Sequence, residues 1–278
     1  MKPPNAGTDS GHTPPASQPD ALVEFDALRR QWREHHLALF LDYDGTLTPI
    51  AARPELATLH PAIRELLARL INRYPVAIVS GRGRRDVKRL VGLEGLIYAG
   101  SHGFDISGPA GFALEHEEGG RFLDALDRAQ AQLDRALSSV QGVLVERKRF
   151  AIAVHYRLVA PDEVPLVALA VDRAANGFPR ALRQTGGKKV FELRPCLPWD
   201  KGSAVRWLLD NFPGQAQESL FPVYIGDDET DEDAFAVVRE LGGIAIVVSA
   251  TPRVSLAHYR LADTDAVAAL LQRLTELN

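Results

Sequence analysis

Cysteine is almost missing from this sequence of 278 residues, in which Cys196 stands alone. One cysteine cannot form an intramolecular disulfide, which favours a reducing compartment. Cys196 also has no cysteine or histidine neighbours at the spacing of a metal site. We therefore expect it to be a small packed side chain and not a ligand.

Long hydrophobic runs and a strong charge of either sign are missing too. No segment reaches the roughly 18 consecutive apolar residues of a membrane span, and no secretory signal can be recognised at the N-terminus. The net charge of −4 gives no general attraction to nucleic acid or to anionic membranes. We expect a soluble, cytoplasmic protein without a nucleic-acid or membrane partner, in which a local basic pocket holds any anionic substrate.

Residues 1–20 contain several prolines among glycine, serine and threonine, and no apolar run. Such a segment cannot bury enough surface to order itself. We predict a disordered, mobile tail over residues 1–20.

The chain from residue 21 to 118, and again from 196 to 278, alternates short apolar runs with segments of helical periodicity. Helices are expected after Pro61, from about residue 86 and after Gly202, and the expected strands are 37–41, 76–79, 96–99, 222–225 and 244–248. This alternation predicts an α/β fold, a parallel-sheet core with helices on both faces. Because Asp42, Ser80 and Asp227 each follow such a strand, we expect them to converge at the carboxyl edge of the sheet.

Residues 119–195 show a different order of expected strands and helices. The expected order is helix 119–140, strands 143–148 and 150–158, helix 162–175, and strands 180–184 and 188–194. This αββαββ order lacks the parallel-sheet alternation. It predicts an antiparallel α+β domain inserted into the core.

Two acidic segments follow predicted strands. Asp42 and Asp44 flank Tyr43 before Gly45, which could be an Asx turn or a pair that binds a divalent cation and divides acid and base roles. Six of the seven residues from 227 to 233 are acidic, which a helix N-terminus or a cation would accommodate. A calcium loop is excluded, because its sixth and twelfth positions would be Glu232 and Val238.

Two further segments could hold phosphate. Ser80-Gly81-Arg82 offers a hydroxyl and backbone N–H groups after a strand, and Lys201 offers an ammonium group at a helix start. Each segment alone is also an ordinary structural feature. The basic run from Arg82 to Arg89 lacks interleaved aromatic residues, so we interpret it as a solvated helix face. Together, the acidic and basic segments supply what phosphoryl transfer needs.

These segments resemble, in order, the four motifs of the haloacid-dehalogenase superfamily. The matching segments are Asp42-Tyr43-Asp44-Gly45-Thr46-Leu47, Ser80-Gly81-Arg82, Lys201-Gly202 and Gly226-Asp227-Asp228-Glu229-Thr230-Asp231-Glu232-Asp233-Ala234-Phe235. Over residues 37–275 the sequence is similar to trehalose-6-phosphate phosphatases. The resemblance implies a Rossmann-like core with an αββαββ cap, which agrees with the order expected for the middle segment. That closer resemblance lies in Ala99-Gly100-Ser101-His102-Gly103, Glu146-x-Lys148, His155-Tyr156-Arg157 and Gly187-Lys188-Lys189-Val190-Phe191-Glu192-Leu193-Arg194-Pro195.

The resemblance implies a Mg²⁺-dependent phosphatase acting on trehalose 6-phosphate through an aspartyl-phosphate. Asp42 would be the nucleophile and Asp44 the acid and base. Mg²⁺ would be bound by Asp42, the Asp44 backbone carbonyl and Asp227, with Asp228 nearby. Asp231 would support this loop or orient Lys201. The phosphoryl oxygens would be held by Ser80 and Lys201, and Gly81 and Arg82 would also contact the substrate.

The cap residues are expected to select the sugar. Glu146 and Lys148 share one strand face, and Lys188 and Glu192 share another; the resemblance assigns these residues to trehalose binding. Without it, they could equally be ion pairs on a solvated sheet face. His102, His155 and Arg157 could contact the substrate or serve the structure.

Two alternatives remain open from the sequence. Another sugar phosphate could be the substrate, such as sucrose 6-phosphate or a glycosyl-phosphoglycerate. The chain could also be a non-catalytic partner of a trehalose-6-phosphate synthase, to which the resemblance implies a functional link. The presence of both Asp42 and Asp44 argues against that last reading, because a binding module needs neither.

Overall fold

The computed structural model describes residues 18–115, 117–212 and 220–277. Eight strands of the described chain form one sheet in the order β12-β11-β10-β1-β2-β3-β4-β5. Its strands are β1 (His36–Leu41), β2 (Val76–Val79), β3 (Ile97–Gly100), β4 (Asp105–Ser107), β5 (Ala113–Glu115), β10 (Leu220–Gly226), β11 (Ile244–Val248) and β12 (Tyr259–Leu261). The first six in this order are parallel, while β4 and β5 are antiparallel.

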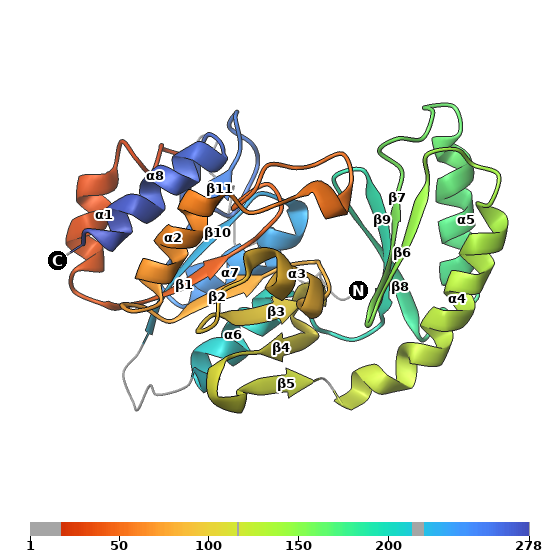
Figure 1. Cartoon of the computed structure of the whole chain (residues 1–278), viewed down its shortest axis with the longest axis horizontal. Helices are drawn as coiled ribbons and strands as arrows, with labels where there is room; N and C mark the ends of the chain where they lie inside the picture. Colours follow the sequence, from red (N-terminus) through yellow and green to blue (C-terminus); the bar gives the residue numbers. More distant parts are fainter. Residues whose placement is uncertain (1–17, 116, 213–219, 278) are drawn as a thin grey trace, which may run out of the picture.

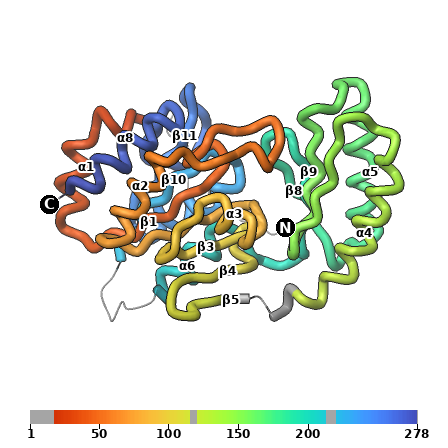
Figure 2. Tube along the Cα trace, viewed as in Figure 1, coloured from red at the N-terminus to blue at the C-terminus, as the bar shows by residue number. Residues whose placement is uncertain are grey.

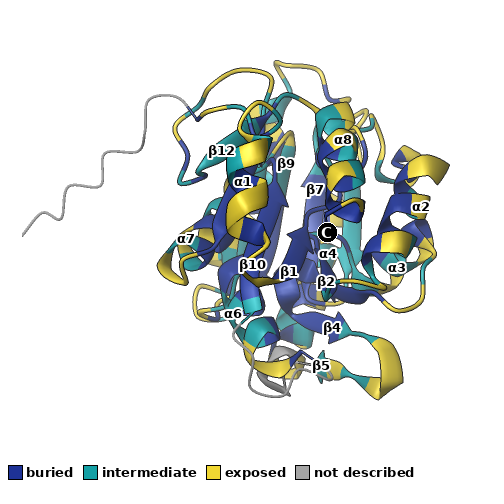
Figure 3. Cartoon of the chain, turned by 90° about the vertical axis from the view of Figure 1, so that its left-hand side faces the viewer, coloured by how far each residue is buried: buried dark blue, intermediate teal, exposed yellow. Residues whose placement is uncertain are grey.

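Helices cover both faces of this sheet, so its central strands are buried from two sides (Figure 3). One face packs against α1 (Phe25–Trp32), α2 (Pro61–Leu70), α3 (Arg84–Val91) and α8 (Thr264–Thr275). The other packs against α6 (Lys201–Asn211) and α7 (Glu232–Glu240). In β1, Leu39 lies in the first layer and Phe40 in the second, which explains the continuous apolar run that the sequence shows there. The prediction of a Rossmann-like core is confirmed.

A second sheet, in the order β6-β7-β9-β8, forms the cap. Its strands and helices are α4 (Leu123–Ala136), β6 (Leu144–Lys148), β7 (Ala151–His155), α5 (Val164–Asn176), β8 (Leu182–Gly187) and β9 (Val190–Pro195). This is the predicted αββαββ order. The sheet faces the core and α4 and α5 lie on its far side (Figure 1), where Ile152 and Val154 pack against them.

The core is built from both ends of the described chain. In the trace of Figure 2, the segments up to β5 and from α6 onward lie together in the core, while the segment from α4 to β9 forms the cap. The strand β1 pairs with β10 on one side and with β2 on the other. The segments that follow β1 and β10, although far apart in sequence, therefore meet at one sheet edge.

Two sequence predictions differ from the structure. Residues 1–17 of the predicted tail lie outside the described residues. Residues 18–20 instead pack on the core, because the backbone of Asp20 forms a parallel β-bridge with that of Arg260 and the Gln18 side chain donates to the carbonyl of Arg253 at 3.1 Å. The prediction of a packed Cys196 is wrong, because it follows the end of β9 and is exposed. Among the described residues, no helix is both long and apolar enough to span a membrane.

Candidate active site

The carboxyl ends of β1, β2 and β10 bring together the residues that follow them. The amide of Asp42 donates to the carbonyl of Ile225 at 2.9 Å, which keeps the start of this loop in register with β10. Asp42, Ser80 and Asp227 then line one pocket, which Lys201 also lines from the N-terminus of α6. This pocket lies where parallel α/β sheets bind their ligands.

A sharp turn after Asp42 brings Gly45 against Asp227, which follows β10. Gly45 has a φ of +84°, and its N–H donates to the carbonyl of Thr48 at 2.7 Å. A Cβ atom at Gly45 would overlap the carboxylate of Asp227. Only glycine combines this backbone conformation with so close an approach. Asp44-Gly45 therefore forms a turn and also one wall of the pocket beside Asp227.

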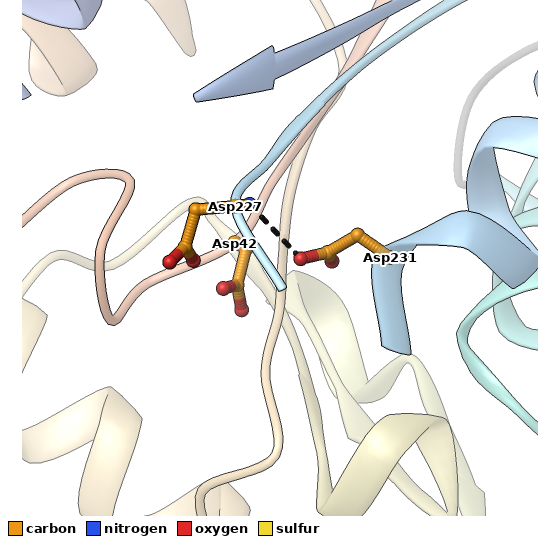
Figure 4. A group of neighbouring side chains, drawn as sticks. All are labelled: Asp42, Asp227 and Asp231. Atoms are coloured by element: carbon orange, nitrogen blue, oxygen red, sulfur yellow. Dashed lines mark hydrogen bonds between the residues drawn. The ribbon is translucent and has the colours of Figure 1, made fainter. Parts of the chain in front are cut away.

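Three buried carboxylates form a cluster in this pocket (Figure 4). One oxygen from each of Asp42, Asp227 and Asp231 lies within 4.8 Å of the others. Burial raises the pKa of Asp42 well above its usual value, although Lys201 counteracts this. Burial also raises the pKa of Asp227 to about 6. Carboxylates gathered in this way need a compensating cation.

The donor set fits a hard divalent cation. Oxygen ligands from carboxylates are what such ions prefer. The Oδ1 atom of Asp227 is buried and accepts no hydrogen bond from the described part of the chain. An unpaired buried carboxylate oxygen is costly unless a cation or donor reaches it.

Asp231 differs from the other two, because protein groups already occupy both its oxygens. Its Oδ1 accepts from Lys201 at 2.7 Å and from the Tyr224 hydroxyl at 2.6 Å. Its Oδ2 accepts the backbone N–H groups of Asp227 and Asp228, at 3.1 and 2.9 Å. Asp231 thus performs both roles that the sequence left open, supporting the loop and orienting Lys201.

Asp228 is less directly involved in the acidic cluster than the sequence predicts. It lines the pocket, but it stays outside the cluster of three carboxylates. Its Oδ1 instead accepts the N–H of Glu229 at 2.7 Å, which caps the short helix that begins there.

Lys201 is the cation at the centre of the cluster. Its side chain is 2% exposed, and its Nζ lies 3.1 Å from Asp42 Oδ1 as well as 2.7 Å from Asp231. Burial favours the neutral amine, but the two carboxylates outweigh it and raise the pKa of Lys201 above its usual value. The ammonium group therefore stays charged beside the predicted nucleophile.

Arg82 is a buried clamp, and the prediction that it lies on a solvated face is wrong. It is 7% exposed. Its Nε and Nη2 donate to the two oxygens of Asp44 at 2.6 and 2.8 Å, and its Nη1 donates to Asp86 at 2.9 Å. Such a bidentate pair fixes the Asp44 carboxylate in one orientation. In this structure Arg82 therefore holds Asp44 and lines the pocket; that it also contacts the substrate stays a prediction.

The cap presents its polar sheet face to the same pocket. In the register of β6, β7 and β9, Glu146 and Glu192 both lie opposite Ala153, and Lys148 lies opposite Ala151. The small alanines leave this face shallow. Lys148 Nζ donates to Glu192 at 2.7 Å and to the carbonyl of Gly81 in the core at 2.9 Å.

The other predicted cap residues also line the pocket. Lys188 forms an ion pair with Asp227, so this cap side chain reaches the acidic cluster. Its backbone carbonyl accepts a hydrogen bond from Arg157 at 2.7 Å. His155 lies 2.8 Å from Glu146 and holds that carboxylate from within the cap.

His102 lies at the boundary between core and cap. Its Nε2 is 2.7 Å from Glu192 Oε2, and both side chains are buried. Burial lowers the pKa of His102 to about 4. Although burial opposes it, Lys148 and His102 hold the pKa of Glu192 well below its usual range.

Sequence reasoning missed one wall of the pocket. Residues 50–54, in the loop between β1 and α2, line it together with the residues above. Their composition, Ile-Ala-Ala-Arg-Pro, carries no signal that separates them from an ordinary loop.

Comparisons with known proteins agree with this geometry. Residues 40–267 match the family described as trehalose-phosphatase. The chain is 39% identical over 270 residues to a probable trehalose-phosphate phosphatase D of Arabidopsis thaliana, covering 94% of this chain and 73% of that protein. It is 38% identical to the trehalose 6-phosphate phosphatase RA3 of Zea mays, covering 92% and 74%. The C-terminal domain of a C. albicans trehalose-6-phosphate phosphatase has the same fold, with a TM-score of 0.80, 23% identity and coverage of 95% and 100%.

Proposed function

Because the chain belongs to the trehalose-phosphatase family, we propose that it hydrolyses trehalose 6-phosphate to trehalose and phosphate, in trehalose biosynthesis. The observation that carries the proposal is the shared pocket. Asp42 and Lys201 lie on its core side, and Glu146, Lys148 and Glu192 lie on its cap side. One pocket thus offers a phosphoryl acceptor and a set of groups that hydrogen-bond sugar hydroxyls.

The residues present account for both steps of the reaction. In the first, an Asp42 carboxylate oxygen forms a bond to phosphorus as the bond from phosphorus to the sugar oxygen breaks. The Asp44 carboxyl gives its proton to that leaving oxygen, which releases trehalose and leaves an aspartyl-phosphate. In the second, Asp44 takes a proton from water as the water oxygen attacks phosphorus, which frees phosphate and restores Asp42.

The surrounding groups orient these two carboxylates. Arg82 donates to both oxygens of Asp44, which fixes the orientation of this carboxylate in the structure. Lys201 lies beside Asp42, and with the Ser80 hydroxyl it would bind the phosphoryl oxygens. Closure of the cap would exclude bulk water from the aspartyl-phosphate.

We further propose Mg²⁺ as the cofactor, bound by the carboxylates of Asp42 and Asp227 and by the backbone carbonyl of Asp44. The unpaired Oδ1 of Asp227 supports this assignment. When bound, the ion would offset the negative charge of the phosphoryl group next to the carboxylates.

Removing the metal is expected to lower phosphate release by about 100-fold or more, because charge neutralisation is lost in the transition state. The measurement is phosphate release from trehalose 6-phosphate after treatment with a chelator, followed by addition of MgCl₂. Full recovery on adding the ion is expected, and calorimetry should show weaker Mg²⁺ binding by Asp227→Asn. Retained activity in protein shown to be metal-free would contradict the assignment.

A panel of sugar phosphates tests the substrate. We expect kcat/KM for trehalose 6-phosphate to exceed that for sucrose 6-phosphate, a glycosyl-phosphoglycerate and glucose 6-phosphate by about ten-fold or more, since several cap hydrogen bonds depend on the sugar. A preference for any other member of the panel would overturn the proposed substrate while leaving the phosphatase chemistry intact.

The setting of the reaction follows from the same assignment. A trehalose-6-phosphate synthase would supply the substrate, which makes such an enzyme a functional partner. The single Cys196 is compatible with the reducing conditions of the cytoplasm.

A further inference from the structure

A strained turn lies directly on Ser80-Gly81-Arg82, the segment proposed to bind phosphate and called the phosphate-binding loop below. Ser101 and His102 are consecutive non-glycine residues in the left-handed region, with φ values of +50° and +58°. Their N–H groups donate to the backbone carbonyls of Arg82 at 2.7 Å and Ser80 at 2.9 Å. A conformation that costs free energy persists where its surroundings hold it, and such positions cluster at functional sites.

This turn brings the ring of His102 against Gly81. A Cβ atom at Gly81 would lie 2.9 Å from the ring Cε1, so the ring fills the space that glycine leaves open. The Nε2 atom then reaches Glu192 Oε2 of the cap at 2.7 Å. His102 thus contacts the phosphate-binding loop through its backbone and ring, and the sugar-facing carboxylate through its Nε2.

Glu192 is held from its other side by a similar connection. Its Oε1 accepts from Lys148 at 2.7 Å, and the same ammonium group donates to the carbonyl of Gly81 at 2.9 Å. Arg194 also lies 3.3 Å from Oε2. Both oxygens of Glu192 are therefore fixed, and two of the groups that fix them are anchored on Gly81.

The protonation states of His102 and Glu192 decide which of the two donates in their hydrogen bond. Burial keeps the ring neutral, and the neighbouring cations keep Glu192 ionised. An ionised carboxylate only accepts hydrogen bonds, so Nε2 carries the proton and donates.

We propose that His102 is a positioning residue that orients Glu192 for the sugar and couples the position of the cap to the phosphate-binding loop. The inference rests on the proposed function, since it concerns a substrate that carries a phosphate and a sugar together. A ligand with a phosphate but no sugar would not use this coupling.

The matched variants His102→Asn and His102→Gln separate this role from simple packing. Both introduce an amide, and both are compared with the wild type by thermal unfolding. The amide nitrogen of glutamine can take the place of Nε2, while that of asparagine is one methylene too short to reach it. Asparagine is also among the residues that tolerate a positive φ, so this variant is expected to fold.

The readout compares trehalose 6-phosphate with p-nitrophenyl phosphate, which has no sugar. In His102→Asn, KM for trehalose 6-phosphate should rise about ten- to 100-fold, as expected for the loss of one hydrogen bond to a charged group. The ratio of kcat/KM for the sugar phosphate to that for the aryl phosphate should fall by about ten-fold or more. His102→Gln should restore this ratio to within about three-fold of the wild type.

Two results would overturn the inference alone, given a wild-type enzyme that prefers trehalose 6-phosphate. One is an unchanged KM in His102→Asn, and the other is an equal loss on both phosphates in both variants, which would assign His102 to the fold. A wild-type enzyme that does not act on trehalose 6-phosphate would instead overturn the proposed function, and this inference with it.

Discussion

Replacing Asp42 with asparagine should lower kcat by about 10⁴-fold or more, because an amide cannot form the aspartyl-phosphate. The rest of the site would remain in place. Lys201 keeps its contact with Asp231 at 2.7 Å, and Asp44 keeps its contacts with Arg82. The measurement is phosphate release from trehalose 6-phosphate under saturating substrate and Mg²⁺.

The fold of this variant should survive. Burial raises the pKa of Asp42, which means that folding disfavours its charged form, so a neutral amide relieves an unfavourable interaction. We expect a melting temperature without added metal at least as high as that of the wild type. The matched control is Asp134→Asn on the exposed side of α4, which should leave both quantities unchanged. Activity within ten-fold of the wild type in Asp42→Asn would refute the assigned nucleophile.

The sequence predicts the core best where burial acts on consecutive residues. The apolar runs at 37–41 and 244–248 correspond to β1 and β11 because both sheet faces are covered, so every side chain must be apolar. The ends of these strands can be predicted equally well, because an apolar run of this kind stops where polar residues begin. The convergence of Asp42, Ser80 and Asp227 follows from those ends and from parallel pairing alone.

Short elements, and ion pairs between residues far apart in the sequence, could not be predicted from the sequence. The three-residue strands β4 and β5 are too short to show a periodicity. The role of Arg82 depends on Asp44, 38 positions earlier, and no local pattern reveals that pair. Its neighbours in the sequence form a basic helix face, and that local pattern alone indicates a solvated surface.

The acidic run shows the same limit within a single segment. Its composition predicts a cation site, but it cannot rank Asp228 against Asp231. That ranking depends on which carboxylate Lys201 and Tyr224 reach, and both lie on other elements. His102 stayed ambiguous for a similar reason, because its partner Glu192 is 90 residues away.

Replacing Lys201 with methionine should lower both stability and activity. Methionine fills a similar volume but carries no charge, so Asp42, Asp227 and Asp231 would be left close together without the buried cation. Breaking a buried ion pair by removing one partner costs about 3–5 kcal/mol. Turnover should fall by about 10³-fold, since the phosphoryl oxygens lose a fixed ammonium group.

Lys88→Met provides the matched control for this substitution. Lys88 also pairs with a carboxylate, Glu94 at 3.2 Å, but both side chains are exposed, at 42% and 87%. Exposed pairs contribute about 0–1 kcal/mol, so this variant should unfold at nearly the wild-type urea concentration. The difference in unfolding free energy between the two variants therefore isolates the effect of burial. Equal stability of the two variants would show that Lys201 does not hold the carboxylate cluster together, and its role would then be confined to the phosphate.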